Sequence, residues 1–180
     1  MKNEIWDIYD ENKQLTGRTM KRNDWNMQPG DYHLTVLGVI RHTDGRYLIT
    51  KRVQTKSWAA GWWEVSGGGV MAGETSQQAV LREVREETGV DAQIIKYVGK
   101  SQYTFTVPED VISKDVHWYL MMSDSYYSKP QREEYFMDSG YYKFHEAYHL
   151  LKFPNEKQIL EKAYNEYMEL KKNNLWKNHR

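Results

Sequence analysis

Gly68–Val90 is the stretch that decides the fold of this chain, and it reads GGVMAGETSQQAVLREVREETGV. It predicts a helix that Thr75 or Ser76 can cap at its start and that ends at Gly89, since glycine favours the C-terminal cap position. A small apolar stripe on this helix is suited to packing on a sheet. The stripe consists of Ala79, Val80 and Val84. The helix therefore has one face for the core and another for chemistry.

Three glutamates share the chemical face of the helix. Glu86 and Glu87 follow Glu83 by three and four residues, so the three carboxylates project from one side. Their charges repel one another, and a bound divalent cation removes that cost. Magnesium takes a few protein carboxylates together with phosphate oxygens, and manganese is its obvious substitute. The face predicts a Mg²⁺ or Mn²⁺ site, with a solvated surface paired to Arg82 and Arg85 as the alternative.

The segment before the helix is rich in glycine. Ser66-Gly67-Gly68-Gly69 lets the backbone turn sharply and approach a ligand closely, because glycine has no Cβ and tolerates positive φ. We therefore expect Gly68 to contact the substrate. Glu74 and Arg82 are better suited to holding this loop, with Arg82 able to pair with Glu74 or with Glu86.

The same stretch resembles the Nudix box, G-x5-E-x7-R-E-U-x-E-E-x-G-U, in which U is aliphatic. The resemblance implies a metal-dependent hydrolase of phosphoanhydride bonds, with Glu83, Glu86 and Glu87 as catalytic metal ligands and the Gly67 carbonyl as a further ligand. It also implies an α+β fold, a mixed sheet sandwiched between helices. The chain fills all nine specified positions, with Gly68, Glu74, Arg82, Glu83, Val84, Glu86, Glu87, Gly89 and Val90.

Resemblance to the family continues before the box. Residues 61–68, GWWEVSGG, resemble the lead-in G-x-W-E-x-P-G-G, with Ser66 in place of the usual proline. Arg52 ends a strand where many members carry a substrate-facing arginine, so it could clamp phosphate or be a surface cation. Trp58 and Trp62 could stack on a base near the expected pocket, whereas strand alternation turns Trp63 inward.

A carboxylate is also needed to orient or deprotonate the attacking water. In this family it is a box glutamate or a carboxylate from a later loop. Glu133 and Glu134 are the candidates from the later loop, because they precede residues 135–138 as an acidic pair precedes the family's late strand. The alternative for this pair is an ordinary charged loop. His33 could contact metal or phosphate, although a histidine at a strand start is more often structural.

The beginning of the chain resembles isopentenyl diphosphate isomerase-like Nudix proteins, through EIWDIYDENKQLTGRT at 4–19 and YHL at 32–34. That resemblance raises proton transfer on an allylic diphosphate as an alternative reaction. The isomerases need a catalytic cysteine, whereas this chain has none and has Gly69 where a histidine is expected. A third hypothesis is a nucleotide- or diphosphate-binding module without turnover, because the base is unidentified and Ser66 is nonstandard.

Composition narrows the remaining classes. The chain has 180 residues, no cysteine, and 25 basic against 25 acidic residues. Charge balance argues against an extended nucleic-acid surface but allows a small nucleotide or diphosphate substrate. The absence of cysteine excludes disulfides and thiolate metal sites. The N-terminal residues form no apolar run, and no segment approaches a spanning helix, so we expect a cytoplasmic protein without a membrane anchor.

The order of elements predicts a single Nudix domain over 1–180. An N-terminal hairpin (about 1–30) precedes the core strands, a loop over Pro108–Asp115 separates two late strands, and a closing helix covers about 155–172. The apolar stripe of the closing helix predicts core packing, with a homodimer contact as the alternative. The expected strands are Glu4–Tyr9, Leu15–Met20, Tyr32–Arg41, Arg46–Lys51, Trp62–Val65, Gln93–Gly99, Gln102–Val107 and Val116–Met122.

Overall fold

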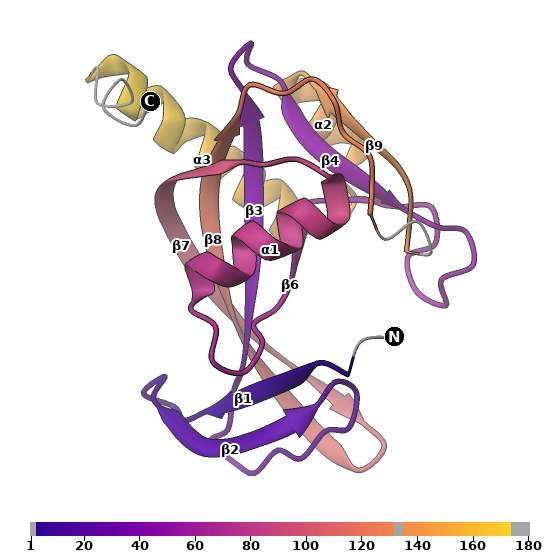
Figure 1. Ribbon diagram of the computed structural model, residues 1–180, viewed down its shortest axis with the longest axis vertical. Coiled ribbons are helices and arrows are strands. Elements are labelled where there is room, and N and C mark those ends of the chain that lie inside the picture. Colours follow the sequence, from indigo (N-terminus) through magenta and orange to yellow (C-terminus); the bar gives the residue numbers. More distant parts are fainter. Residues whose placement is uncertain (1–2, 132–134, 174–180) are drawn as a thin grey trace.

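The computed structural model of the protein describes residues 3–131 and 135–173. In this part of the chain, a mixed sheet carries helices on both faces, and a two-stranded N-terminal hairpin crosses one end of it (Figure 1). The hairpin consists of β1 (Ile5–Tyr9) and β2 (Leu15–Lys21). The sheet contains β3 (His33–His42), β4 (Tyr47–Arg52), β5 (Trp63–Glu64), β6 (Ser66–Gly69), β7 (Gln93–Val107), β8 (Asp110–Ser123) and β9 (Phe136–Tyr142). The helices are α1 (Ser76–Thr88), α2 (Phe144–Leu150) and α3 (Pro154–Lys172).

The sheet separates two apolar cores. On one face, α1 packs its stripe against β3 residues such as Val36 and Ile40. On the other face, α3 packs Ile159 and Ala163 against β3 and β8, including Val39. Alternation along β3 sends Val36 and Val39 to opposite faces. Figure 1 shows α1 in front of β3 and α3 behind it. The predicted α+β sandwich is confirmed.

Helix α1 begins and ends at caps that the sequence specifies. Thr75 accepts a hydrogen bond from the Gln78 backbone N–H, and the Gln78 side chain accepts one from the Thr75 N–H, which together form a capping box. Gly89 ends the helix in the left-handed conformation, with φ of 72°. These caps fix where the carboxylate face of α1 begins and ends.

Strand β3 changes its partner along its length. It pairs with β6 over Thr35–Gly38 and with β4 farther along, at Ile40 and Arg41. The sheet is therefore split beside β3, with β6 on one side of the gap and β4, β5 and β9 on the other. The sharp turn expected for the glycine segment is wrong, because Gly67 is extended in β6. Its glycine is needed for close approach, since a Cβ there would lie 2.1 Å from the Val36 carbonyl oxygen.

The loop expected over Pro108–Asp115 is also wrong. β7 continues to Val107 and β8 begins at Asp110, so only two residues connect a long hairpin. The reason is tertiary: Ile112 is fully buried in a cluster with Trp6 and other residues of the N-terminal hairpin. Packing with a distant segment thus keeps a polar stretch in strand conformation. None of the helices in the described part of the chain is both long and apolar enough to cross a membrane.

Gly67→Ala should destabilise the protein by about 2 kcal/mol or more, because the new methyl group overlaps the β3 backbone. Thermal and urea denaturation would measure the loss. Gly17→Ala is the matched control, since Gly17 has φ of +80° and a methyl group there would meet no atom within 4 Å. Gly17→Ala should lower the free energy of unfolding by only about 1 kcal/mol, through backbone strain. Equal losses in the two variants would contradict the close approach of β6 to β3.

Candidate metal and substrate site

A cavity of about 410 Å³ lies at the split in the sheet. The glycines of β6 form part of its wall, and side chains from α1, β5 and the start of α3 project into it. Its volume falls in the range of small-molecule sites. Among the described residues, four carboxylates line it from those three elements: Glu64, Glu83, Glu87 and Glu156.

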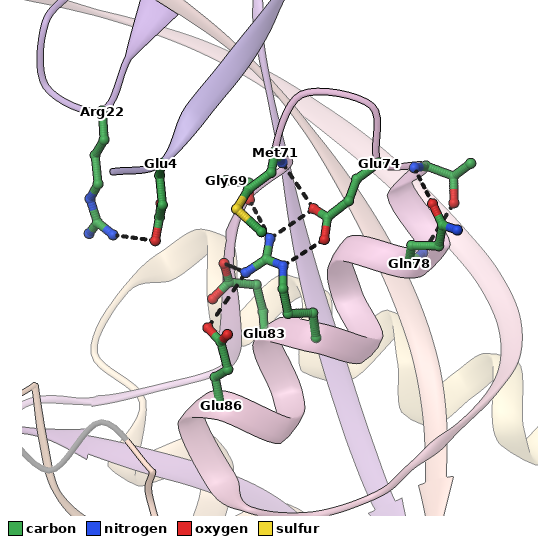
Figure 2. Close-up of polar contacts among 10 residues, drawn as sticks. Glu4, Arg22, Gly69, Met71, Glu74, Gln78, Glu83 and Glu86 are labelled. Atoms are coloured by element: carbon green, nitrogen blue, oxygen red, sulfur yellow. Dashed lines mark hydrogen bonds and ion pairs between the residues drawn. The ribbon is translucent and has the colours of Figure 1, made fainter. Parts of the chain in front are cut away.

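Arg82 holds the loop before α1 against this cavity wall. Its guanidinium donates to both carboxylate oxygens of Glu74, at 2.6 and 2.9 Å, and to the Gly69 carbonyl at 3.0 Å. It also donates to Glu83 at 2.6 Å and lies 3.6 Å from Glu86 (Figure 2). Partial burial would raise the pKa of Glu74, but the bonds from Arg82 and Met71 outweigh burial and lower that pKa. Arg82 therefore pairs with both of the partners expected from its spacing.

Glu83 and Glu87 are buried together beside β6. The Gly67 N–H donates to Glu87 at 3.0 Å, and a Cβ on Gly68 would lie 2.5 Å from the Glu83 carboxyl carbon. Burial raises the pKa of Glu87 well above its usual value, and the charges of Glu83 and Glu64 raise it further. Buried, mutually repelling oxygen ligands beside a strand without side chains fit a hard divalent cation.

The described residues do not already form a finished metal centre. No group of three His, Cys, Asp or Glu side chains within 3–131 and 135–173 has the geometry to hold an ion. Arg82 neutralises part of the charge on Glu83, and Glu86 lies beside Arg82 rather than in the cavity lining. Binding of a cation by all three box glutamates would therefore require side-chain rearrangement around Arg82.

Two cavity carboxylates, Glu64 and Glu156, were absent from the candidates chosen by sequence. Glu64 lies in the lead-in motif and accepts from Arg52, with both oxygens 3.3 Å from Nη1. Glu156 is 7% exposed, accepts from the Val65 N–H, and has one oxygen without a partner among the described residues. Burial raises the pKa of Glu156 well above its usual value, and Glu64 adds to the shift. Glu156 follows the helix-starting Pro154, where an acidic residue is ordinary, so no sequence signal distinguishes it.

The predicted substrate-binding side chains are placed unequally. Arg52 lines the cavity but is paired with Glu64. Trp58 lines it as well, whereas Trp62 does not. Both tryptophans contact Phe153, with ring centroids 5.0 and 4.9 Å away. Trp63 packs against the core on the α3 side of the sheet. Glu133 and Glu134 lie outside the described residues.

Comparison with known proteins assigns the family. A family model described as NUDIX domain matches residues 31–163. A Nudix hydrolase of Listeria monocytogenes is 38% identical over 117 residues, covering 63% of this chain and 69% of the relative. The CTP pyrophosphohydrolase of Escherichia coli is 39% identical over 69 residues, covering 38% of this chain and 50% of the relative. A crystal structure from Deinococcus radiodurans superposes with a TM-score of 0.65 at 19% identity, covering 89% of this chain and 99% of that one.

The fold and these relatives define a hydrolase that acts on acid anhydrides. The chain belongs to the Nudix family.

Glu87→Gln and Glu156→Gln should each stabilise the metal-free protein at neutral pH. Burial raises the folded-state pKa of both carboxyls above the unfolded value, so stability is lost as the pH rises from the unfolded-state pKa towards the folded-state pKa. An amide of the same size avoids that loss. We expect a gain of about 1 kcal/mol, or about 2–4 °C in Tm, near pH 7.5 and little difference below about pH 4.

Thermal denaturation in the presence of a chelator, from pH 4 to 8, would measure these gains. Glu161→Gln is the matched control, because Glu161 is exposed on α3. Its Tm should follow that of the unchanged protein at every pH. A loss of stability at neutral pH in both cavity variants would show that the carboxyls are well solvated or well paired.

Proposed function

We propose that the protein hydrolyses a phosphoanhydride bond in a nucleoside diphosphate linked to another moiety, or in a related organic diphosphate, using Mg²⁺ or Mn²⁺. The observation that carries this proposal is the burial of Glu83 and Glu87 side by side against β6, inside a cavity large enough for a small molecule. Buried carboxylates that repel one another are costly unless they serve a ligand. A cation bound to diphosphate oxygens supplies the missing positive charge.

In the proposed mechanism, Glu83, Glu86, Glu87 and the Gly67 carbonyl hold the cation. When bound, it neutralises developing charge on phosphate oxygens and lowers the pKa of a coordinated water. Gly68 leaves room for the Glu83 carboxylate, since any Cβ there would collide with it, and the diphosphate would bind beside this pair. Arg82 would hold the loop before α1 through Glu74 and the Gly69 carbonyl while Glu83 and Glu86 rearrange around it.

The carboxylate that orients or deprotonates water is assigned to Glu134, which lies outside the described residues. Glu156 is a second candidate for this task, because the side chain lines the cavity and one of its oxygens has no partner in the part of the chain that the structure describes. Burial raises the pKa of Glu156, which makes its carboxylate a stronger base. In substrate binding, Arg52 would clamp a phosphate by exchanging its bond with Glu64, and Trp58, which lines the cavity beside Phe153, would stack on a base.

The relatives named as hydrolases support hydrolysis over the isomerase alternative, and the absence of cysteine points the same way. Membership of the isopentenyl diphosphate isomerase-like subgroup stays a proposal, supported by the sequence of β1, β2 and the start of β3. The binding module without turnover also stays an alternative. The assignment of 1–180 to one domain and the formation of a homodimer stay proposals.

A substrate panel would test the proposed reaction. Purified protein with Mg²⁺ or Mn²⁺ should release phosphate-containing products from some of these compounds: nucleoside triphosphates, dinucleotides, nucleotide sugars, ADP-ribose and isoprenoid diphosphates. Chromatography of the products would identify the bond that is cleaved. Recovery of every compound intact with both metals would contradict hydrolysis, and tight binding of an intact compound would favour the module without turnover.

Glu83→Gln and Glu87→Gln should each lower kcat at least about 100-fold, which corresponds to about 2.7 kcal/mol of barrier. Each change removes a negative charge from the cation site but keeps the size of the side chain. Mg²⁺ should raise the Tm of the unchanged protein in a concentration-dependent manner and should raise that of the variants less. Glu161→Gln should behave as the unchanged protein in both assays. If both variants kept full activity and the same rise in Tm with Mg²⁺, the three glutamates would be ordinary surface residues and would not bind the metal.

A further inference from the structure

The cavity that the box glutamates line is also lined by residues of the N-terminal hairpin and of the strands beside it. We call this part of the cavity the N-terminal chamber and define it by Glu4, Trp6, Arg22, Trp25, His33 and Lys114, all of which line the cavity. The hairpin crosses the end of β3 and β8 in Figure 1. His33 and Lys114 are paired in register on these two parallel strands, so they lie at the same end of the sheet. The chamber is therefore built jointly by the hairpin and the sheet.

Two aromatic side chains bring buried N–H groups to this chamber. Trp6 and His33 are 5% and 1% exposed, and their rings stack with centroids 4.0 Å apart. Within 3–131 and 135–173, neither Trp6 Nε1 nor either ring nitrogen of His33 has a hydrogen-bond partner. Burial, with the nearby charges of Lys114 and Arg22, lowers the pKa of His33 to about 3. The imidazole is neutral at pH 7 and offers one N–H, while the indole can only donate.

One of the two cations of the chamber, Lys114, has no paired carboxylate among the described residues, whereas the other, Arg22, is paired with Glu4. Lys114 lies near the rings of Trp25 and Phe105, with Nζ 5.7 and 5.4 Å from their centroids, and pairs with no carboxylate of the described residues. Burial and the charge of Arg22 lower the pKa of Lys114. Arg22 donates to Glu4 at 3.1 Å, and Figure 2 shows this pair apart from the Arg82 network. Buried donors next to an unmatched cation favour a ligand that has negative oxygens.

Strand β6 connects this chamber to the box glutamates. The Gly67 N–H binds Glu87, and a Cβ on Gly69 would lie 3.0 Å from Trp6 Nε1. The two contacts are separated by two strand residues, or about 7 Å. A phosphate-containing substrate that lies along β6 can therefore reach both the carboxylates and the chamber. Gly69 lets the buried indole pack against β6, because a side chain at this position would press against its Nε1.

We propose that the N-terminal chamber binds a phosphate group of the substrate that lies beyond the bond being hydrolysed. The assignment rests on the proposed hydrolase function and narrows its substrate class to compounds with a further anionic phosphate. Trp6 and Arg22 precede residue 31, where the NUDIX domain match begins. His33 and Lys114 lie within the match, so the chamber combines residues of the family domain with residues that precede it.

Titration of inorganic phosphate into metal-free, ¹⁵N-labelled protein tests the chamber directly. The Trp6 indole N–H signal, identified by its absence from Trp6→Phe, should shift and saturate because the N–H gains an acceptor. Lys114→Met should weaken phosphate binding about tenfold or more, because it removes the unmatched cation. Lys21→Met is the matched control, since Lys21 is exposed on β2 and does not line the cavity. This control should bind within about twofold of the unchanged protein.

A Trp6 signal that stays in place, or equal phosphate binding by Lys114→Met and the unchanged protein, would overturn the proposal that the chamber binds phosphate. Turnover tests the link to substrate. Lys114→Met should lower kcat/KM about tenfold more for a nucleoside triphosphate than for a nucleoside diphosphate joined to an uncharged sugar. An equal effect on both compounds would show that the chamber takes free phosphate only. If nothing is hydrolysed, the proposed function fails, while the phosphate titration still decides whether the chamber binds.

Discussion

The buried guanidinium of Arg82 is the interaction on which the architecture of the site depends. It joins the Gly69 carbonyl of β6, Glu74 of the loop and Glu83 of α1 in one network. Burial alone would favour an uncharged Arg82, but its bonds to Glu74 and the charge of Glu83 raise its pKa. Without this partly buried cation, Glu74 and Glu83 would lose their guanidinium donor and the Gly69 carbonyl would lose its side-chain donor, and the loss of such partners costs more than their pairing contributes.

The network leaves the other cavity carboxylates less compensated. Glu87 has one backbone N–H as a donor, and Glu156 has another, whereas Glu64 has Arg52. Their mutual repulsion lowers the stability of the metal-free fold, and a cation relieves it. The same carboxylates that weaken the fold thus provide the affinity for a ligand. Because these carboxylates lie on three different elements, the packing of the cores on both sides of the sheet can offset the loss of stability.

Features set by neighbouring residues were predictable from the sequence, and features set by distant contacts were not. The caps and apolar stripe of α1 depend on residues within a few turns, so Thr75 and Gly89 could be identified. Gly67 is extended because β3 pairs with it, and no local pattern shows that pairing. Glu156 enters the site because α3 begins at the mouth of the split in the sheet. For a similar reason, Trp58 and not Trp62 lines the cavity.

The N-terminal hairpin shows how apolar packing can prepare polar recognition. Ile8, Met20 and Ile112 are buried with Trp6 in one cluster, which fixes the indole ring against His33. A ring fixed in this way presents its N–H in one direction without losing further side-chain entropy on binding. The long β7–β8 hairpin supplies Ile112 to the cluster and Lys114 to the chamber wall two residues later. Since alternate strand residues face the same side, one register places the apolar anchor and the cation together. Shifting this register by a single residue would bury Lys114 elsewhere and expose the indole. The stability of the hairpin cluster and the charge pattern of the chamber are therefore specified by the same strand pairing.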